Sequence, residues 1–143
     1  ESSHEDQRRP QTYHFSGNTI LIVDDNQIHR LLISNFLEDT KATISTANNG
    51  EIAWESIQCE RPDLILADSR MPVMTGFQLL KRVRENKDTA NIPFAIISAG
   101  ATTDEIEYSS SLHCDAHLSK PIDRATLLST CNGFLNTVSD QKP

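Results

Sequence analysis

The chain has 143 residues, a length that fits one domain better than two. It carries 13 Lys and Arg against 20 Asp and Glu, a net charge of −7, which argues against nucleic acid or an anionic membrane surface as its main partner. The three cysteines lie far apart in the sequence, and no apolar run approaches the roughly 18 residues of a membrane span. We therefore expect a cytoplasmic protein with reduced thiols, with no direct contact to nucleic acid and no membrane insertion.

Five short apolar runs alternate with five amphipathic segments along the chain. The runs are rich in aliphatic and β-branched residues, as expected of strands in a sheet covered on both faces. They cover residues 19–23, 42–46, 64–67, 94–97 and 116–118. The segments that follow them have apolar residues at helical spacing, around residues 28–37, 51–59, 77–83, 105–112 and 125–135. This alternation predicts an α/β fold with a parallel sheet between two layers of helices.

The two ends of the chain differ from this pattern. Residues 1–17 are polar and charged, contain Pro10 and Gly17, and show no apolar period. We interpret them as a flexible tail or linker. The folded domain is predicted over residues 18–138, followed by a short C-terminal tail at 139–143.

Polar side chains follow four of the predicted strands. Asp24 and Asp25 follow the first strand, Asp68 the third, Ser98 the fourth, and Lys120 comes after the fifth. Because the carboxyl ends of parallel strands meet at one edge, where open α/β sheets bind ligands, we expect these side chains to converge. Clustered carboxylates repel one another unless a hard cation such as Mg²⁺ joins them. A carboxylate in such a site can attack a phosphoryl group, while an ammonium and a hydroxyl stabilise the phosphoryl oxygens.

Residues 18–138 resemble a response-regulator receiver domain of two-component signalling. The resemblance rests on Asp24-Asp25 after ILIV, the run DSRMPVMTG at 68–76, Ser98-Ala99 after FAII, and Lys120-Pro121, in that order. It implies a flavodoxin-like (βα)5 sandwich, with five parallel strands in the order 2-1-3-4-5.

The resemblance also implies a role for each residue of the site. Asp68 would accept the phosphoryl group, and Lys120 and Ser98 would contact the phosphoryl oxygens. The Lys120–Pro121 peptide bond would be cis. The implied Mg²⁺ ligands are Asp24, Asp25, Asp68 and the backbone carbonyl of Arg70.

Two further features of the sequence bear on how the switch would work: the residue three before the lysine, and the residues beside the path of the hydrolytic water. Three residues before the lysine, where the family usually has Tyr or Phe, this chain has His117, so a switch role there stays open. A titratable group at that position predicts sensitivity to pH. Arg70 and Gly100 occupy positions that flank the path of the hydrolytic water in the family, and we expect them to modulate dephosphorylation.

The predicted function is that of a phosphoacceptor signalling switch rather than an enzyme, although the domain would promote its own phosphorylation and dephosphorylation. The phosphoryl group would come from a phosphohistidine of a histidine kinase or a histidine phosphotransfer protein. Phosphorylation would change the face formed by the helix around 105–112, the strand at 116–118 and the helix around 125–135. That face would control a downstream effector or an attached output domain.

Two alternatives remain open. A degenerate receiver would bind proteins without phosphorylation, although none of the key residues is lost here. A Mg²⁺-dependent phosphatase with an aspartyl nucleophile is less favoured, because it would need a second acid two residues after a nucleophile on the first strand, where Gln27 stands. A stand-alone regulator and a receiver within a larger protein both fit, the latter as the cytoplasmic portion of a membrane-bound hybrid kinase.

Overall fold

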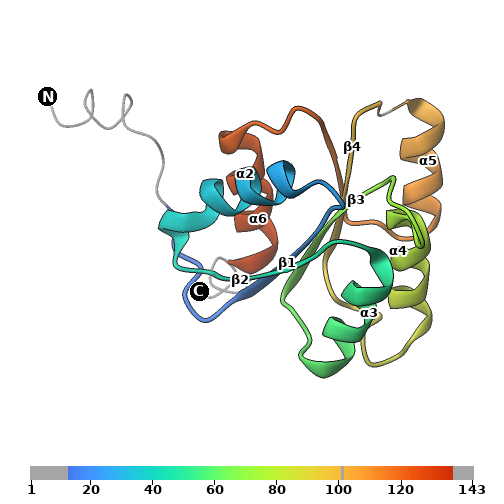
Figure 1. Cartoon of the computed structure of the whole chain (residues 1–143), viewed down its shortest axis with the longest axis horizontal. Helices are drawn as coiled ribbons and strands as arrows, with labels where there is room; N and C mark the ends of the chain where they lie inside the picture. The colour runs from blue at the N-terminus through green and yellow to red at the C-terminus, as the bar shows by residue number, and fades with distance from the viewer. Residues whose placement is uncertain (1–12, 101, 137–143) are drawn as a thin grey trace, which may run out of the picture.

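The protein is a five-stranded parallel sheet between two layers of helices, in the strand order β2-β1-β3-β4-β5 (Figure 1). The structure, a computed structural model, describes residues 13–100 and 102–136. The strands are β1 (Thr19–Val23), β2 (Thr43–Ala47), β3 (Leu64–Asp68), β4 (Phe94–Ser98) and β5 (Ala116–Ser119). The helices are α2 (Gln27–Leu37), the 3₁₀ turn η1 (Glu38–Thr40), α3 (Gly50–Cys59), α4 (Gly76–Glu85), α5 (Thr103–Ser111) and α6 (Arg124–Leu135). The predicted fold class and strand order are confirmed.

Each face of the sheet carries its own apolar core. Successive side chains of a strand point to opposite faces, so a strand covered on both sides is apolar throughout. The first core joins β1, β3 and β4 to α3 and α4 through Leu21, Val23, Ile65, Ala67, Ile96, Ile57 and Leu80. The second core joins the same strands to α2 and α6 through Ile20, Ile22, Leu66, Ala95, Ile33, Leu127 and Leu128. The helix α5 lies beside α4, where the rings of Phe77 and Tyr108 meet edge to face at 5.1 Å between centroids (Figure 1).

Each α-helix within the described residues begins with a capping side chain that accepts a backbone N–H of the first turn. These caps are Asn26, Asn49, Thr75, Thr102 and Asp123. Such caps satisfy N–H groups that would otherwise lack partners and fix where a helix starts. Because each helix starts shortly after a strand ends, the caps hold the connecting loops at the carboxyl edge of the sheet. The connecting loops and the helix starts therefore converge at the carboxyl edge of the sheet.

Residues 13–17 pack against the domain and do not extend as a flexible tail. Phe15 is completely buried in the core between the sheet and α2 and α6, and its backbone N–H donates to the carbonyl of Thr40 at 2.7 Å. The ring of Tyr13 stacks on Phe15, with 6.0 Å between the centroids. Two isolated aromatic residues in a polar stretch have no periodicity, which is why the sequence pattern does not reveal this anchor. Residues 1–12 and 137–143, predicted as tails or as the domain's last residues, lie outside the described residues.

None of the described helices is both long enough and apolar enough to cross a membrane.

Candidate functional site

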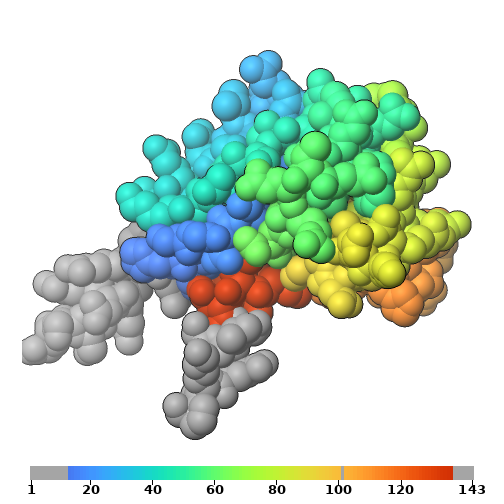
Figure 2. All heavy atoms as spheres, turned by 90° about the horizontal axis from the view of Figure 1, so that it is seen from below, coloured from blue at the N-terminus to red at the C-terminus, as the bar shows by residue number. Residues whose placement is uncertain are grey.

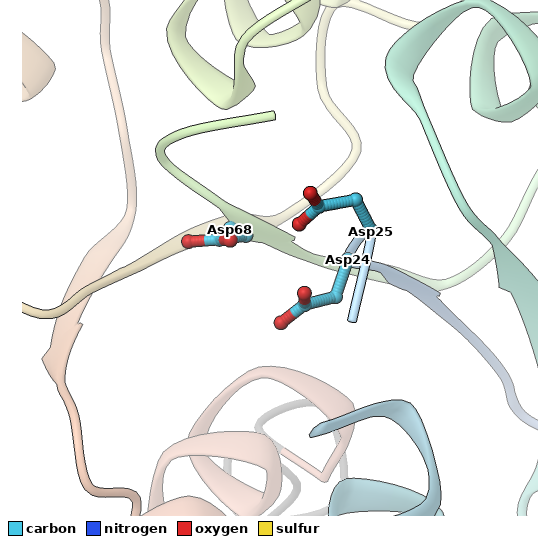
Figure 3. A group of neighbouring side chains, drawn as sticks. All are labelled: Asp24, Asp25 and Asp68. Carbon is cyan, nitrogen blue, oxygen red and sulfur yellow. The ribbon is translucent and has the colours of Figure 1, made fainter. Parts of the chain in front are cut away.

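Three aspartates converge at the carboxyl edge of the sheet, as predicted. Asp24 and Asp25 directly follow β1, and Asp68 is the last residue of the neighbouring strand β3. A carboxylate oxygen from each lies within 4.8 Å of one from each of the others, and Figure 3 shows all three turned toward one space. Asp24 and Asp68 are buried, whereas Asp25 is exposed. The site is therefore a half-open acidic pocket with its floor inside the protein.

Lys120 reaches this pocket from the loop after β5. Its Nζ lies 3.4 Å from Oδ1 of Asp68 and 3.6 Å from Oδ2 of Asp24. The backbone N–H of Lys120 donates to the carbonyl of Ser98 at 2.8 Å, which holds the loop against the end of β4. The Lys120–Pro121 peptide bond is cis. The predicted approach of a lysine to the acidic cluster is thus present in the structure.

The electrostatics of the pocket favour a cation. Burial is the main cause that raises the pKa of Asp68, and the charge of Asp24 raises it further, while the charge of Lys120 lowers it in part. One ammonium group does not balance three carboxylates. Hard carboxylate oxygens clustered around a shared space are the donor set that Mg²⁺ prefers, with water in its other positions. The residues present therefore fit a Mg²⁺ ion held by Asp24, Asp25 and Asp68.

The loop after β3 is pressed against the end of that strand. The backbone N–H of Gly76, the first residue of α4, donates to the carbonyl of Ser69 at 3.2 Å. A Cβ atom at Gly76 would collide with the backbone carbonyl of Asp68. The side chain of Thr75 caps the helix, and Gln78 completes a capping box with it. Helix α4 is thereby seated directly on the peptide that carries the Asp68 side chain.

The side chain of Arg70 pairs with a residue of α5. Its side chain is 83% exposed, and its Nη2 lies 3.3 Å from Oε2 of Glu105 in the first turn of α5. The other oxygen of Glu105 is buried without a hydrogen-bond partner among the described residues. Gly100 is exposed, and a Cβ added there would have no atom within 4 Å. The ion pair between Arg70 and Glu105 thus links the loop that follows Asp68 to α5.

Ser98 and His117 form a direct hydrogen bond beside the pocket. Oγ of Ser98, which is buried, lies 3.0 Å from Nε2 of His117 on the neighbouring strand β5. The other ring nitrogen, Nδ1, lies 3.2 Å from Oγ of Ser109 on α5, which is also buried. Burial lowers the pKa of His117, and the charge of Glu105 raises it in part. Sequence reasoning singled out Ser98 and His117 but missed Ser109, which has no signal beyond its place in a run of three serines.

His29 is a second residue that the strand-end pattern does not reveal. It lies in the first turn of α2, and its Nδ1 is 3.2 Å from Nζ of Lys120 and 3.3 Å from Oδ2 of Asp24. The only signal in the sequence is its position four residues after Asp25, one helical turn beyond the acidic pair. His29 therefore covers the side of the pocket that faces α2.

Comparison with known proteins gives one consistent answer. The family model of the response regulator receiver domain matches residues 20–132. The chain is 32% identical over 114 residues to the two-component response regulator ORR3 of Oryza sativa subsp. japonica, a match that covers 79% of this chain and 87% of that protein. It is 34% identical over 118 residues to the autoinducer 1 sensor kinase/phosphatase LuxN of Vibrio harveyi. That match covers 82% of this chain but only 14% of LuxN.

Solved structures with the same fold agree with these sequence matches. Chemotaxis protein CheY4 of Vibrio cholerae superposes with a TM-score of 0.78 at 30% identity, covering 82% of this chain and 98% of that one. The receiver domain of the sensor histidine kinase PA1611 of Pseudomonas aeruginosa PAO1 superposes with a TM-score of 0.78 at 26% identity. It covers 85% of this chain and 99% of its own, and it holds a magnesium ion in its active-site cleft.

Proposed function

The chain belongs to the response regulator receiver domains of two-component signalling, and from this premise we propose that it is a phosphoacceptor switch whose acceptor is Asp68. The phosphoryl donor is a phosphohistidine of a histidine kinase or of a histidine phosphotransfer protein. The observation that carries the proposal is the placement of Asp68, buried at the end of a central strand, within reach of two further carboxylates and of Lys120. Asp24 shares these neighbours, but its carboxylate also accepts the backbone N–H of Asn26 at 2.8 Å and lies 3.3 Å from Nδ1 of His29.

Asp68 acts as the nucleophile in this proposal. One carboxylate oxygen attacks the phosphorus in line, an O–P bond forms, and the P–N bond breaks with its electron pair returning to the donor imidazole. Asp24, Asp25, Asp68 and the backbone carbonyl of Arg70 would hold a Mg²⁺ ion, which would supply positive charge to the phosphoryl oxygens and favour the ionised form of Asp68. Lys120, already 3.4 Å from Asp68, pairs with a phosphoryl oxygen once the group arrives. Water later attacks the phosphorus, releases inorganic phosphate and restores the carboxylate.

The signal leaves through the face formed by α5, β5 and α6. Ser98 and His117 connect the pocket to β5, and Ser109 continues the contact to α5. A phosphoryl group adds negative charge and acceptor oxygens beside these side chains, which changes the hydrogen bonds they can make. This face would then control a downstream effector or an attached output domain. The match to LuxN, a sensor kinase/phosphatase, supports a hybrid kinase as one such setting.

The test is phosphorylation with a small donor. The chain is incubated with acetyl phosphate and Mg²⁺, and the intact mass is measured before and after alkali. We expect the mass of one phosphoryl group to be gained, to resist acid and to be lost in base, and to be absent in Asp68→Asn. Asp104→Asn, which removes an exposed aspartate from the first turn of α5, is the matched control and should be phosphorylated normally.

The same experiment separates the alternatives. No mass gain in the wild-type chain would refute the phosphoacceptor proposal and favour a receiver that binds partners without phosphorylation. Continuous release of phosphate from a range of phosphate esters would favour the phosphatase. Loss of the mass gain in Asp104→Asn as well as in Asp68→Asn would show that Asp68 has no special role.

A further inference from the structure

Three side chains form a hydrogen-bonded chain from α5 to the phosphoacceptor pocket. Ser109 on α5 contacts Nδ1 of His117 on β5 at 3.2 Å, and Nε2 of His117 contacts Ser98 at the end of β4 at 3.0 Å. Both serines are buried, with 1% of their surface exposed. Because buried polar groups keep their hydrogen bonds, the direction of each bond is fixed by what its neighbours can donate.

The contacts of Ser109 on α5 determine which atom donates and which accepts in each of these hydrogen bonds. Oγ of Ser109 lies 2.9 Å from the backbone carbonyl of Ile106, which can only accept, so the single hydroxyl proton of Ser109 is used there. Ser109 must then accept from His117, which places the proton of the neutral imidazole on Nδ1. Nε2 is left with a lone pair, and Ser98 must donate its own hydroxyl proton to it.

We propose that His117 is a positioning residue that holds the hydroxyl proton of Ser98 in the resting state and releases it toward the phosphoryl group when the imidazole takes up a second proton. The proposal rests on Asp68 as the phosphoacceptor and concerns only how that state is sensed. In the resting state the proton of Ser98 is directed at His117 and is not available to an oxygen on Asp68. When Nε2 also carries a proton, the bond reverses, Ser98 accepts from His117, and its hydroxyl proton is free to donate to a phosphoryl oxygen.

The charged surroundings of His117 set the pH at which this reversal occurs. Glu105 on α5 is the charged group that acts on the ring, and Arg70 from the loop after β3 pairs with that carboxylate. The groups in direct contact, Ser98 on β4 and Ser109 on α5, are neutral. Burial lowers the pKa of His117, so the neutral form prevails at neutral pH in the resting protein. A phosphoryl group adds negative charge beside Ser98 and needs a donor, and both effects favour the protonated ring.

Protonation of His117 and binding of the phosphoryl group are thermodynamically linked. If phosphorylation raises the affinity of His117 for a proton, then a proton on His117 raises the affinity of the pocket for a phosphoryl group by the same factor. The activated state is therefore favoured by acid through His117.

The test uses the whole chain and NMR of the imidazole nitrogens, with beryllofluoride and Mg²⁺ as the phosphoryl mimic. At neutral pH without the mimic, we expect the proton on Nδ1 of His117. Ser109→Ala should shift the proton toward Nε2, whereas Ser110→Ala, an exposed neighbour on the same helix, should leave it on Nδ1. With the mimic bound, the pKa of His117 should rise by about one pH unit, and the mimic should bind about tenfold more tightly below the resting pKa than above the raised pKa.

His117→Phe supplies the background. The pH dependence of mimic binding that remains in His117→Phe belongs to other groups of the protein. The contribution of His117 is therefore the difference in pH dependence between the wild type and His117→Phe. A proton on Nε2 in the resting wild type, or a pKa of His117 that the mimic leaves unchanged, would overturn the proposal. The proton position in the resting protein does not depend on the phosphoacceptor role. The pKa comparison is made on protein that acetyl phosphate has been shown to modify at Asp68, so the two proposals fail separately.

Discussion

Gly76 lies directly against the backbone carbonyl of Asp68, with no room for a Cβ atom between them. The contact joins the first residue of α4 to the last residue of β3. The N–H of Gly76 donates to the carbonyl of the next residue, Ser69, at 3.2 Å. A side chain at position 76 would push the start of α4 and the Asp68 peptide apart. The position of the Asp68 carboxylate therefore depends on a glycine eight residues away.

Gly76→Ala should destabilise the protein and impair phosphorylation. The obstacle is backbone, which cannot rotate away, so we expect a loss of about 1–3 kcal/mol in the free energy of unfolding, as for other overpacked sites. Urea denaturation measures the stability, and the rate of modification by acetyl phosphate measures the site. Gly133→Ala is the control, because Gly133 is exposed within α6 and a Cβ there meets nothing within 4 Å. It should gain about 0.5–1 kcal/mol and leave phosphorylation unchanged. Equal effects of the two substitutions would contradict the role assigned to the Gly76 contact.

Local patterns in the sequence were sufficient for the α/β class and for the acidic cluster, whereas the strand order was implied by the resemblance to receiver domains. A strand buried on both faces is apolar throughout and ends where polar residues begin, so Asp24, Asp25 and Asp68 mark strand ends without any knowledge of contacts. The alternation with helices then fixes parallel strands, and parallel strands place their carboxyl ends together. A helix cap is also a local signal, since the side chains of Thr75 and Thr102 accept N–H groups only three residues further along the chain.

The remaining features depend on contacts between segments far apart in the chain. Phe15 is anchored by residues of α2 and α6, and nothing in its own neighbourhood predicts burial. The bond from Ser109 to His117 joins a helix to a strand, and neither residue belongs to a local motif that requires the other. His29 reaches Lys120 across 91 positions of sequence. Such pairings follow from packing, which a single sequence does not encode in a periodic pattern.

Arg84→Ala should destabilise the fold without changing the chemistry of the site. The Arg84 side chain is 13% exposed, and its guanidinium donates to the carbonyls of Ala90, Ile92 and His113 and to the carboxylate of Asp115, at 2.7–3.0 Å. These partners lie before β4 and β5, at the edge of the sheet opposite Asp68. We expect a loss of about 1–3 kcal/mol, as when partly buried acceptors are left without their hydrogen-bond donor. Urea denaturation and acetyl phosphate rates provide the two measurements.

The matched control for Arg84 lies two residues earlier on the same helix. Arg82 is exposed and stacks over the ring of Trp54 at 5.7 Å. Arg82→Ala should cost only about 0.5–1 kcal/mol, the range of an exposed cation–π contact. A similar loss in both variants would show that the network around Arg84 adds nothing beyond an ordinary surface arginine.

Arg70→Ala should shorten the lifetime of the aspartyl phosphate. In the resting structure Arg70 pairs with Glu105 at 3.3 Å, and a phosphoryl group of greater negative charge competes for the same guanidinium. An arginine drawn to the phosphoryl group obstructs water, and its loss should speed hydrolysis by up to about fivefold, since exposed pairs contribute about 1 kcal/mol at most. Glu105→Gln releases Arg70 and should lengthen the lifetime instead. Lys81→Ala, which removes an exposed cation from α4, should leave the lifetime unchanged. Lifetimes are measured from the decay of the phosphorylated mass after acetyl phosphate is removed.

Mg²⁺ should stabilise the wild-type chain through the acidic pocket, and Asp68→Asn should abolish most of that effect. Burial and the charge of Asp24 raise the pKa of Asp68, so the folded state holds a proton there more tightly than the unfolded state does. Stability from this group is therefore present in acid and is lost as the pH rises through the folded pKa. At neutral pH without metal, Asp68→Asn should accordingly unfold at a higher temperature than the wild type, and the difference should vanish in acid.

Mg²⁺ at about 100 times its Kd should add about 2.7 kcal/mol to the wild type. Chelation should reverse the gain, and Asp104→Asn should respond to Mg²⁺ as the wild type does. Equal stabilisation of Asp68→Asn by Mg²⁺ would place the ion elsewhere on the protein.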